Sequence, residues 1–261
     1  MVSSQQKTGP NGAVLKGGHA AGERLFYLKA ILVLYAAWAL VFELVGHVAN
    51  TLPTVDLTLP LDRRIPFIAV FVWPYILCHV WPFLPFAALK DWHRANRAFL
   101  AILLANLTAY LVYILIPVAF PRPELGTSLS DQVLAWYYKV DFYPGANKLP
   151  SLHVAFIWIT AIACRKQRLG RVGDGLVLLG AALITLSTLF VKQHILLDAV
   201  LGIAWGFAAW FAAGRLYPSL VGPAGAPADA LKRLVRKAVP ATLIYLVILL
   251  LVAAFVLRRP F

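Results

Sequence analysis

The sequence is poor in cysteine: 261 residues contain only two, and neither belongs to a Cys-x-x-Cys pair. Cys78 and Cys164 both fall inside apolar runs, where a free cysteine behaves as a small buried hydrophobe. A disulfide framework and a cysteine-based metal motif are therefore not expected. The first 20 residues are polar and rich in glycine, so a cleaved signal peptide is not predicted either.

Acidic residues are also scarce, with 11 Asp and Glu against 24 Lys and Arg and a formal charge of +13. In a soluble protein, this excess of positive charge would raise the question of nucleic-acid binding. Here the basic residues lie mostly between long apolar segments, where membrane topology and anionic lipid headgroups explain them. We therefore expect no nucleic-acid partner.

What the sequence has in abundance is apolar residues, which make up 61% of the chain. Soluble domains contain about 45–50%. The residues come in long blocks, which predicts an all-α, polytopic membrane bundle, because a lipid-embedded helix satisfies its own backbone hydrogen bonds. A span needs about 20 mostly apolar residues. Seven are predicted, at about 25–49, 66–89, 98–120, 150–165, 175–192, 195–215 and 240–258, of which the fourth and fifth look short.

The loops predict an orientation for these spans. If the N-terminus is cytoplasmic, most Lys and Arg residues fall in cytoplasmic segments, as the positive-inside rule requires. We expect a cytoplasmic tail at 1–24, a six-span core at 25–215, a cytoplasmic linker with a basic amphipathic segment at 216–239, and a seventh transmembrane helix at 240–261. The seventh span could provide a contact surface for a homo-oligomer. The C-terminus would then lie on the outer face.

The longest outer loop, 121–149, contains the segment SDQVLAWYYKV. Ser130 and Asp131 are residue types that cap helices, and the aromatic residues suit a short helix on the membrane surface. We expect Trp136, Tyr137 and Tyr138 to shape the access of lipid to a site on this face.

Several polar residues stand at the outer ends of the spans, where they point to function by default. In the segment KQHILLD, 192–198, His194 and Asp198 are four residues apart and share a helix face. A carboxylate that holds one imidazole nitrogen as N–H leaves the other nitrogen nucleophilic. His194 would also lie at a helix N-terminus, whose free N–H groups favour an anion. This combination suits attack on phosphorus.

The segment KLPSLH, 148–153, provides complementary groups. Pro150 can begin a helix, and Ser151 would face the same pocket. His153 is suited to act as the general acid that protonates a leaving oxygen. The charge of the phosphoryl oxygens needs cations close by. The candidates on this face are Arg122, Lys148 and Lys192.

Other interpretations remain open. His194 and Asp198 could form a structural hydrogen bond, and the two lysines could extend to the interface. The same basic pocket could bind an anionic lipid in a transporter or flippase without cleaving it, although the two matching halves typical of transporters are not found. A non-catalytic membrane scaffold would not need the two histidines and Asp198 together. His79 is interpreted as a packing residue, and Glu43 remains without an assigned role.

Three motifs together resemble the type 2 phosphatidic acid phosphatase superfamily, and they are closest in style to its inositol phosphorylceramide synthase-like branch. The motifs are Arg122-Pro123, Pro150-Ser151-Leu152-His153, and Ser187-Thr188 followed by His194 and Asp198. Three departures are clear. Leu152 replaces a glycine, Thr188 replaces a phosphate-binding arginine, and Leu115 stands where the first motif has a lysine. Lys192 is a candidate to replace the missing arginine.

The resemblance implies a six-helix phosphatase-type core, with the predicted seventh span outside it. It implies His194 as nucleophile, Asp198 as its orienting partner and His153 as general acid, with a phosphohistidine intermediate. The implied substrate is a membrane lipid phosphate or phosphodiester, and the acceptor is water or a lipid alcohol. No metal and no other cofactor is expected, and the site is expected on the non-cytoplasmic face.

Overall fold

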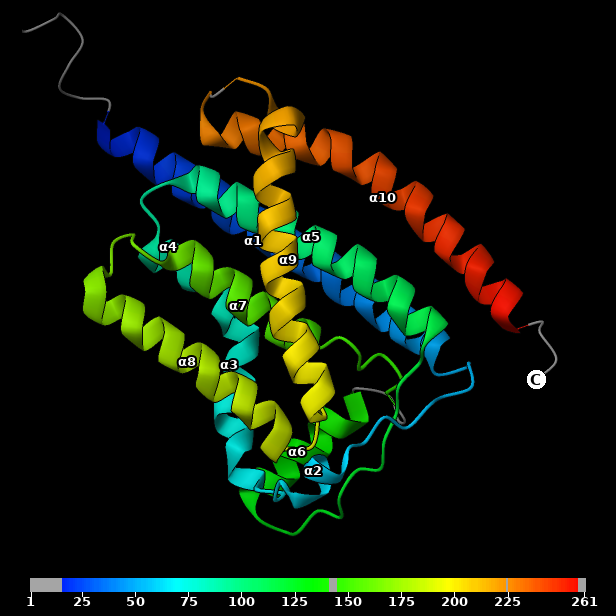
Figure 1. The fold of residues 1–261 in the computed structure, drawn as a ribbon. Coiled ribbons are helices and arrows are strands. Elements are labelled where there is room, and N and C mark those ends of the chain that lie inside the picture. Colours follow the sequence, from blue (N-terminus) through cyan, green and yellow to red (C-terminus); the bar gives the residue numbers. More distant parts are fainter. Residues whose placement is uncertain (1–15, 141–144, 224, 258–261) are drawn as a thin grey trace, which may run out of the picture.

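The structure, a computed structural model, describes residues 16–140, 145–223 and 225–257, and within these ranges it is helical without a β-strand. Five of the described helices are long and apolar enough to cross a membrane. They are α1 (Lys16–Ala49), α5 (Trp92–Leu115), α8 (Gly170–Phe190), α9 (Leu196–Val221) and α10 (Pro227–Leu257). The predicted helical, multi-pass membrane bundle is confirmed at this level (Figure 1).

The other two predicted spans are shorter than a full crossing. The second is divided into η1 (Ala69–Phe71), α3 (Val72–Val80), η2 (Trp81–Phe83) and α4 (Leu84–Ala88). Pro82 and Pro85 lie at the breaks, because proline lacks the N–H that would continue a helix. The fourth is α7 (Leu152–Cys164), whose 13 residues extend only about 20 Å. The six-plus-one count of spans therefore stays a prediction.

Three boundaries differ from the predicted domains. Helix α1 already begins at Lys16, so part of the expected tail is helical, and residues 1–15 lie outside the described residues. Helix α9 continues to Val221 and α10 begins at Pro227. The expected linker 216–239 is thus mostly helix, and its basic segment forms the first turns of α10. The apolar pattern did not predict the start of α10, because the polar first turns of this helix and its apolar span form one continuous helix.

Helix α5 lies at the centre of the bundle and packs against α1, α7, α9 and α10. Helices α7 and α9 approach each other closely at two glycines of α9. A Cβ atom at Gly202 would lie 2.6 Å from the Ser151 carbonyl oxygen, and one at Gly206 would lie 2.7 Å from that of Ala155. Small residues allow membrane helices such close approach. This contact fixes the start of α9 beside the start of α7.

The outer faces of the bundle are apolar. On α10, Leu243, Ile244 and Leu251 are each more than half exposed, and α8 exposes Leu176 and Leu179 to a similar extent. So many exposed large apolar side chains would be unfavourable in water, whereas contact with the apolar chains of lipid is favourable. The charged residues named in the predicted site lie at one end of the bundle instead.

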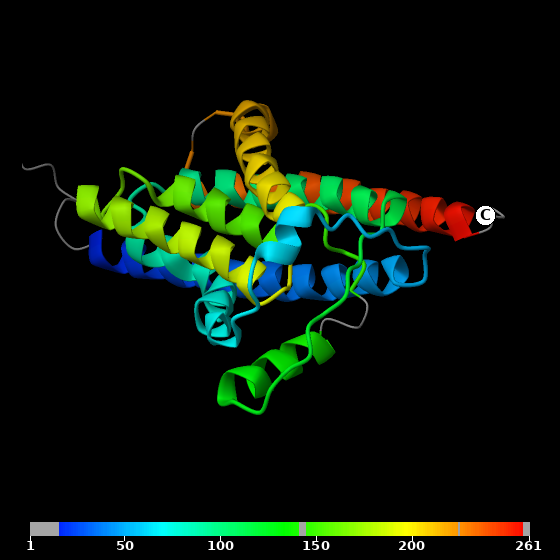
Figure 2. The same ribbon diagram turned by 60° about the horizontal axis from the view of Figure 1, so that its bottom comes forward.

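That end gathers α2 (Pro60–Arg64), α6 (Leu129–Val140) and the adjoining ends of α7, α8 and α9 (Figures 1 and 2). The predicted short helix in the long loop is present as α6, which stands apart from the long helices in Figure 2. Its cap differs from the prediction. Ser128 Oγ accepts from the Asp131 N–H at 3.2 Å, whereas Ser130 Oγ accepts from Trp73 Nε1.

Candidate active site

The loop that carries His194 is a tight turn between α8 and α9. The backbone N–H groups of Gln193 and His194 both donate to the Thr188 carbonyl oxygen, at 3.0 and 3.1 Å. Lys192 has a φ of 51°, in the left-handed region. Thr188, at the position of the motif arginine, is fully buried, and its hydroxyl donates to the Thr185 carbonyl. Thr188 therefore shapes the loop and does not face a cavity.

His194 and Asp198 form the expected pair. His194 Nδ1 lies 3.2 Å from Asp198 Oδ2, which also accepts from the Ile195 N–H at 3.2 Å. Both side chains are buried, Asp198 completely. A carboxylate can only accept, so it selects the tautomer with the proton on Nδ1 and leaves the lone pair on Nε2. Asp198 Oδ1 is buried without a hydrogen-bond partner among the described residues.

The start of α9 differs from the expectation of an open anion site. The Leu196 N–H donates to Asp62 Oδ1 at 2.6 Å, and the Ile195 N–H donates to Asp198. Two carboxylates therefore already occupy these amides. The sequence could not show this contact, because Asp62 lies on α2, far from α9 in the chain. The Asp62 carboxylate provides the negative charge that a helix N-terminus favours.

The start of α7 is also organised differently from the prediction. Ser151 is the N-cap, and its Oγ accepts from the Val154 N–H at 3.3 Å. Pro150 precedes this cap rather than beginning the helix, and its carbonyl accepts from the Tyr113 hydroxyl at 2.8 Å. The Ser151 N–H donates to the Asp198 carbonyl oxygen at 3.1 Å. This main-chain bond joins the starts of α7 and α9 directly and places His153 beside His194.

The two histidine rings face each other across this junction. The centroids of His153 and His194 are 5.8 Å apart, with an interplanar angle of 59°. Lys148 is also close, since its Nζ lies 3.3 Å from Oε1 of Gln193, the residue before His194. Lys148 is only 4% exposed, so its charge lies inside the protein beside the loop that carries His194. The structure thus brings together five of the predicted site residues, namely Lys148, Ser151, His153, His194 and Asp198.

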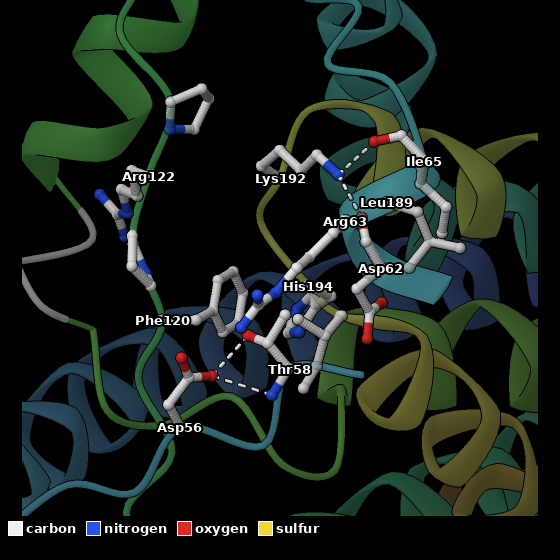
Figure 3. A pocket seen from close by; sticks show the side chains of 13 residues that line it. Asp56, Thr58, Asp62, Arg63, Ile65, Phe120, Arg122, Leu189, Lys192 and His194 are labelled. Carbon is white, nitrogen blue, oxygen red and sulfur yellow. Dashed lines mark hydrogen bonds between the residues drawn. The ribbon is translucent and has the colours of Figure 1, made fainter. Parts of the chain in front are cut away.

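His194 lines a cavity of about 400 Å³, called the ionic cavity here, which Figure 3 shows from close by. Arg122 and Lys192, both predicted to bind phosphate, line it too. So does Arg63 of α2, a cation to which the sequence had assigned no role in the site. Figure 3 shows Arg63 extending from α2 toward Asp56 and Thr58. The full lining is Asp56, Thr58, Asp62, Arg63, Ile65, Phe120, Pro121, Arg122, Pro123, Leu189, Lys192, His194 and Ile195.

The cations of the ionic cavity are held in different ways. Lys192 Nζ donates to the carbonyl oxygens of Asp62 and Ile65 at 3.0 and 2.6 Å. Burial lowers the pKa of Lys192, and the charge of Asp62 acts in the opposite direction. Arg122 donates to the Tyr138 carbonyl at 2.7 Å and lies over the ring of Tyr138, 4.4 Å from its centroid. Arg63 is exposed.

Asp56 lines the same cavity as Arg63 and is influenced by its charge. The hydrogen bonds from Thr58 lower the pKa of the Asp56 carboxyl, and the charge of Arg63 adds to this effect. Together, the side chains leave three cations and two carboxylates around the cavity. An anion in this cavity would therefore meet an excess of positive charge next to His194.

His153 lines a second cavity, of about 220 Å³, which we call the aromatic cavity. Its lining is Tyr35, Trp38, Ala39, Phe42, Glu43, Tyr75, His79, Trp136, Tyr137, Val140, His153 and Gln193. Trp136 and Tyr137, two of the three residues expected to shape lipid access, line this cavity. Tyr138 does not line this cavity, because its hydroxyl donates to the Val191 carbonyl and its ring supports Arg122.

Two further residues gain a place in the site. Glu43, which had no assigned role, lines the aromatic cavity with His153. His79, interpreted as a packing residue, lies in the same lining, with its ring centroid 6.0 Å from that of His153. A lone His or Glu in a predicted span carries no signal that would place it here, because the contact depends on how α1, α3 and α7 pack.

No family model, curated protein or solved structure matches the chain.

Proposed function

We propose that the chain is an integral-membrane lipid phosphatase or phosphotransferase that works through a phosphohistidine intermediate. One observation carries the proposal. His194, buried and paired with Asp198, has its ring centroid 5.8 Å from that of His153, and the two histidines line the ionic and the aromatic cavity respectively. A nucleophile with an oriented tautomer, an acid opposite it, and adjacent cations are the groups that phosphoryl transfer needs.

In the first half-reaction, His194 Nε2 attacks phosphorus and the bond from phosphorus to the lipid oxygen breaks. His153 gives its proton to this oxygen, so the lipid leaves as an alcohol. In-line attack needs about 3–3.5 Å between nucleophile and phosphorus, and the hydrogen bond to the leaving oxygen adds about 2.7–3 Å. The ring centroids of His194 and His153 lie 5.8 Å apart, so a group that reacts at His194 is also close to His153.

In the second half-reaction, His153 accepts the proton of the incoming hydroxyl, whose oxygen attacks the phosphohistidine. The P–N bond breaks and returns the electron pair to His194. The Asp198 carboxylate stabilises the imidazolium character that develops on His194 while it is being phosphorylated. Water as acceptor gives a phosphatase, and a lipid hydroxyl gives a headgroup transferase, while the protein groups and their roles stay the same.

The two cavities support a particular placement of the substrate. The phosphate, with any polar headgroup, lies in the ionic cavity, where Arg63, Arg122 and Lys192 neutralise the equatorial oxygens. Lys192 has three N–H donors and gives two to carbonyls, which leaves a third for the phosphate. The leaving lipid alcohol lies on the His153 side, against Trp136 and Tyr137 of the aromatic cavity.

The proposal is tested with purified protein and a panel of labelled lipid phosphates and phosphodiesters, with and without lipid alcohols such as diacylglycerol or ceramide. Free phosphate or free phosphorylated headgroup identifies a phosphatase, and a new labelled lipid identifies a transferase. Vanadate, which mimics pentacoordinate phosphorus, should inhibit either activity. Movement of labelled lipid across vesicles without any chemical conversion would instead identify the transporter interpretation and reject the catalytic one.

A further inference from the structure

Three potential metal ligands meet beside the aromatic cavity, on helices α3 and α7. One ligand atom from each of Cys78, His79 and His153 can be chosen so that all three atoms lie within 4.8 Å of one another. Cys78 is buried, and the two histidines are half-buried. The sequence gave no sign of this cluster, because Cys78 and His153 are far apart in the chain and no metal-binding spacing is present.

The two ring nitrogens of His79 have the surroundings expected of a histidine that binds a metal ion. Its Nδ1 lies 3.1 Å from the Tyr35 hydroxyl, and its Nε2 is buried without a hydrogen-bond partner among the described residues. A histidine that binds metal through one nitrogen usually donates from the other to an oxygen, which fixes the tautomer. A buried ring nitrogen without a partner is costly unless something binds it.

A small cavity adjoins the cluster. It has a volume of about 90 Å³, and its lining includes Cys78, His79 and His153. One water molecule has a share of liquid volume of about 30 Å³. The cavity therefore has room for a cation and for a water molecule in the fourth position of a tetrahedral site.

We propose that Cys78, His79 and His153 bind a soft divalent cation of the zinc class, and that this cation holds His153 out of the reaction. One thiolate and two imidazoles form a ligand set that selects zinc over magnesium or calcium. Bond lengths of about 2.0–2.3 Å bring the ligand atoms of tetrahedral zinc to roughly 3.5 Å from one another. Small side-chain rotations from the present spacing are sufficient. Binding releases the Cys78 thiol proton to solvent and involves no oxidation or reduction.

The inhibitory part rests on the proposed function. A His153 nitrogen bound to a cation can no longer carry the proton that the leaving lipid oxygen needs. General acid catalysis contributes about 10²–10⁴-fold to a rate, so a saturating cation should reduce turnover by at least about 10²-fold. The cation thus inhibits the reaction. This role is compatible with the expected mechanism, in which no metal ion takes part.

The binding part is tested without any activity assay, by titrating the purified full chain in detergent with Co²⁺. Thiolate ligation gives Co²⁺ an intense near-ultraviolet charge-transfer absorption, which Zn²⁺ should then displace. The band should appear in the wild type and in the control Cys164→Ser, since Cys164 is the other buried cysteine and lies outside the cluster. It should be absent from Cys78→Ser and weakened at least tenfold in affinity in His79→Gln.

Thermal unfolding of each variant without metal shows whether it is folded, and Zn²⁺ should raise the melting temperature of only those proteins that bind it. A wild type without the band, or a band that survives Cys78→Ser, rejects the site. Zn²⁺ inhibition is then compared with each variant's own metal-free rate and should vanish in Cys78→Ser. If the band behaves as expected but no lipid phosphate turns over, the site stands and the proposed function fails.

Discussion

The two cavities on either side of the histidine pair are built in opposite ways. The ionic cavity is framed by backbone and charge, since Lys192 is held by two carbonyl oxygens and Arg122 by a carbonyl and a ring. The aromatic cavity is framed by ring contacts, such as the stacking of His79 on Tyr137 with centroids 5.6 Å apart. The first can order a charged headgroup, and the second can accommodate an apolar chain without fixing it.

Under the proposed function, this difference matches the two halves of a lipid substrate, which need different kinds of protein surface. A phosphate needs donors at fixed positions, because charge stabilisation depends on short, directed hydrogen bonds. An acyl chain needs area but little direction. Substitutions on the ionic side should therefore cause large losses of rate, and those on the aromatic side should change which lipid is used.

The largest effect is expected for His194→Ala, which removes the nucleophile shared by every proposed substrate. Turnover of all lipids in the panel should fall to background, and no acid-labile phosphoprotein should form. The matched control is His47→Gln, because His47 is an exposed histidine outside both cavities. Significant turnover by a folded His194→Ala protein would exclude the proposed mechanism.

His153→Gln should have the next largest effect, and the effect should depend on the leaving group. A lipid alcohol needs a proton as it leaves, so its release should slow by about 10²–10⁴-fold. Nitrophenyl phosphate releases nitrophenolate, a stable anion that needs no proton, so its cleavage by the same variant should slow much less. Equal losses with both substrates in stopped-flow measurements would mean that His153 has a structural role rather than that of an acid.

Arg63→Ala should separate the ionic cavity from general surface charge. Arg63 lines the cavity, whereas Arg64, its neighbour on α2, does not, and both are exposed. Loss of one group that stabilises transition-state charge costs about 10²-fold. We expect kcat/KM to fall on that order in Arg63→Ala and to stay within about twofold in Arg64→Ala. Similar values for the two variants would remove Arg63 from the phosphate site.

The local parts of the site could be predicted from the sequence, and the parts assembled from distant segments could not. The spacing of His194 and Asp198 predicts a shared helix face, and the structure confirms their contact. In contrast, Asp62 reaches the start of α9 from α2, and no periodicity in the chain encodes that contact. The long apolar helices were predicted on the same local basis, while the C-terminal end of α9 and the start of α10 differ from the prediction.

Gly206→Ala tests the close packing of α9 against α7, which fixes the positions of the two cavities relative to each other. Its new Cβ would meet the Ala155 carbonyl at 2.7 Å, and backbone cannot move aside as a flexible side chain can. Overpacking of this kind costs about 1–3 kcal/mol. The melting temperature should fall and activity should fall with it. Gly175→Ala is the control, because a Cβ there meets nothing within 4 Å, and it should be neutral or slightly stabilising.

The smallest effect is expected on the aromatic side, for Trp136→Ala. Trp136 is 59% exposed and lines the aromatic cavity but not the ionic one, so it offers apolar area to a chain without ordering the phosphate. Each buried methylene is worth about 0.8 kcal/mol, so kcat/KM should rise less steeply with acyl chain length in the variant than in the wild type. Phe211→Ala is the control, because Phe211 is equally exposed but lies on α9 outside both cavities. If Trp136→Ala instead lowers the rates of all chain lengths by the same factor, α6 serves the phosphate side, through Tyr138 and Arg122, and the division between the two cavities does not correspond to the division of the lipid.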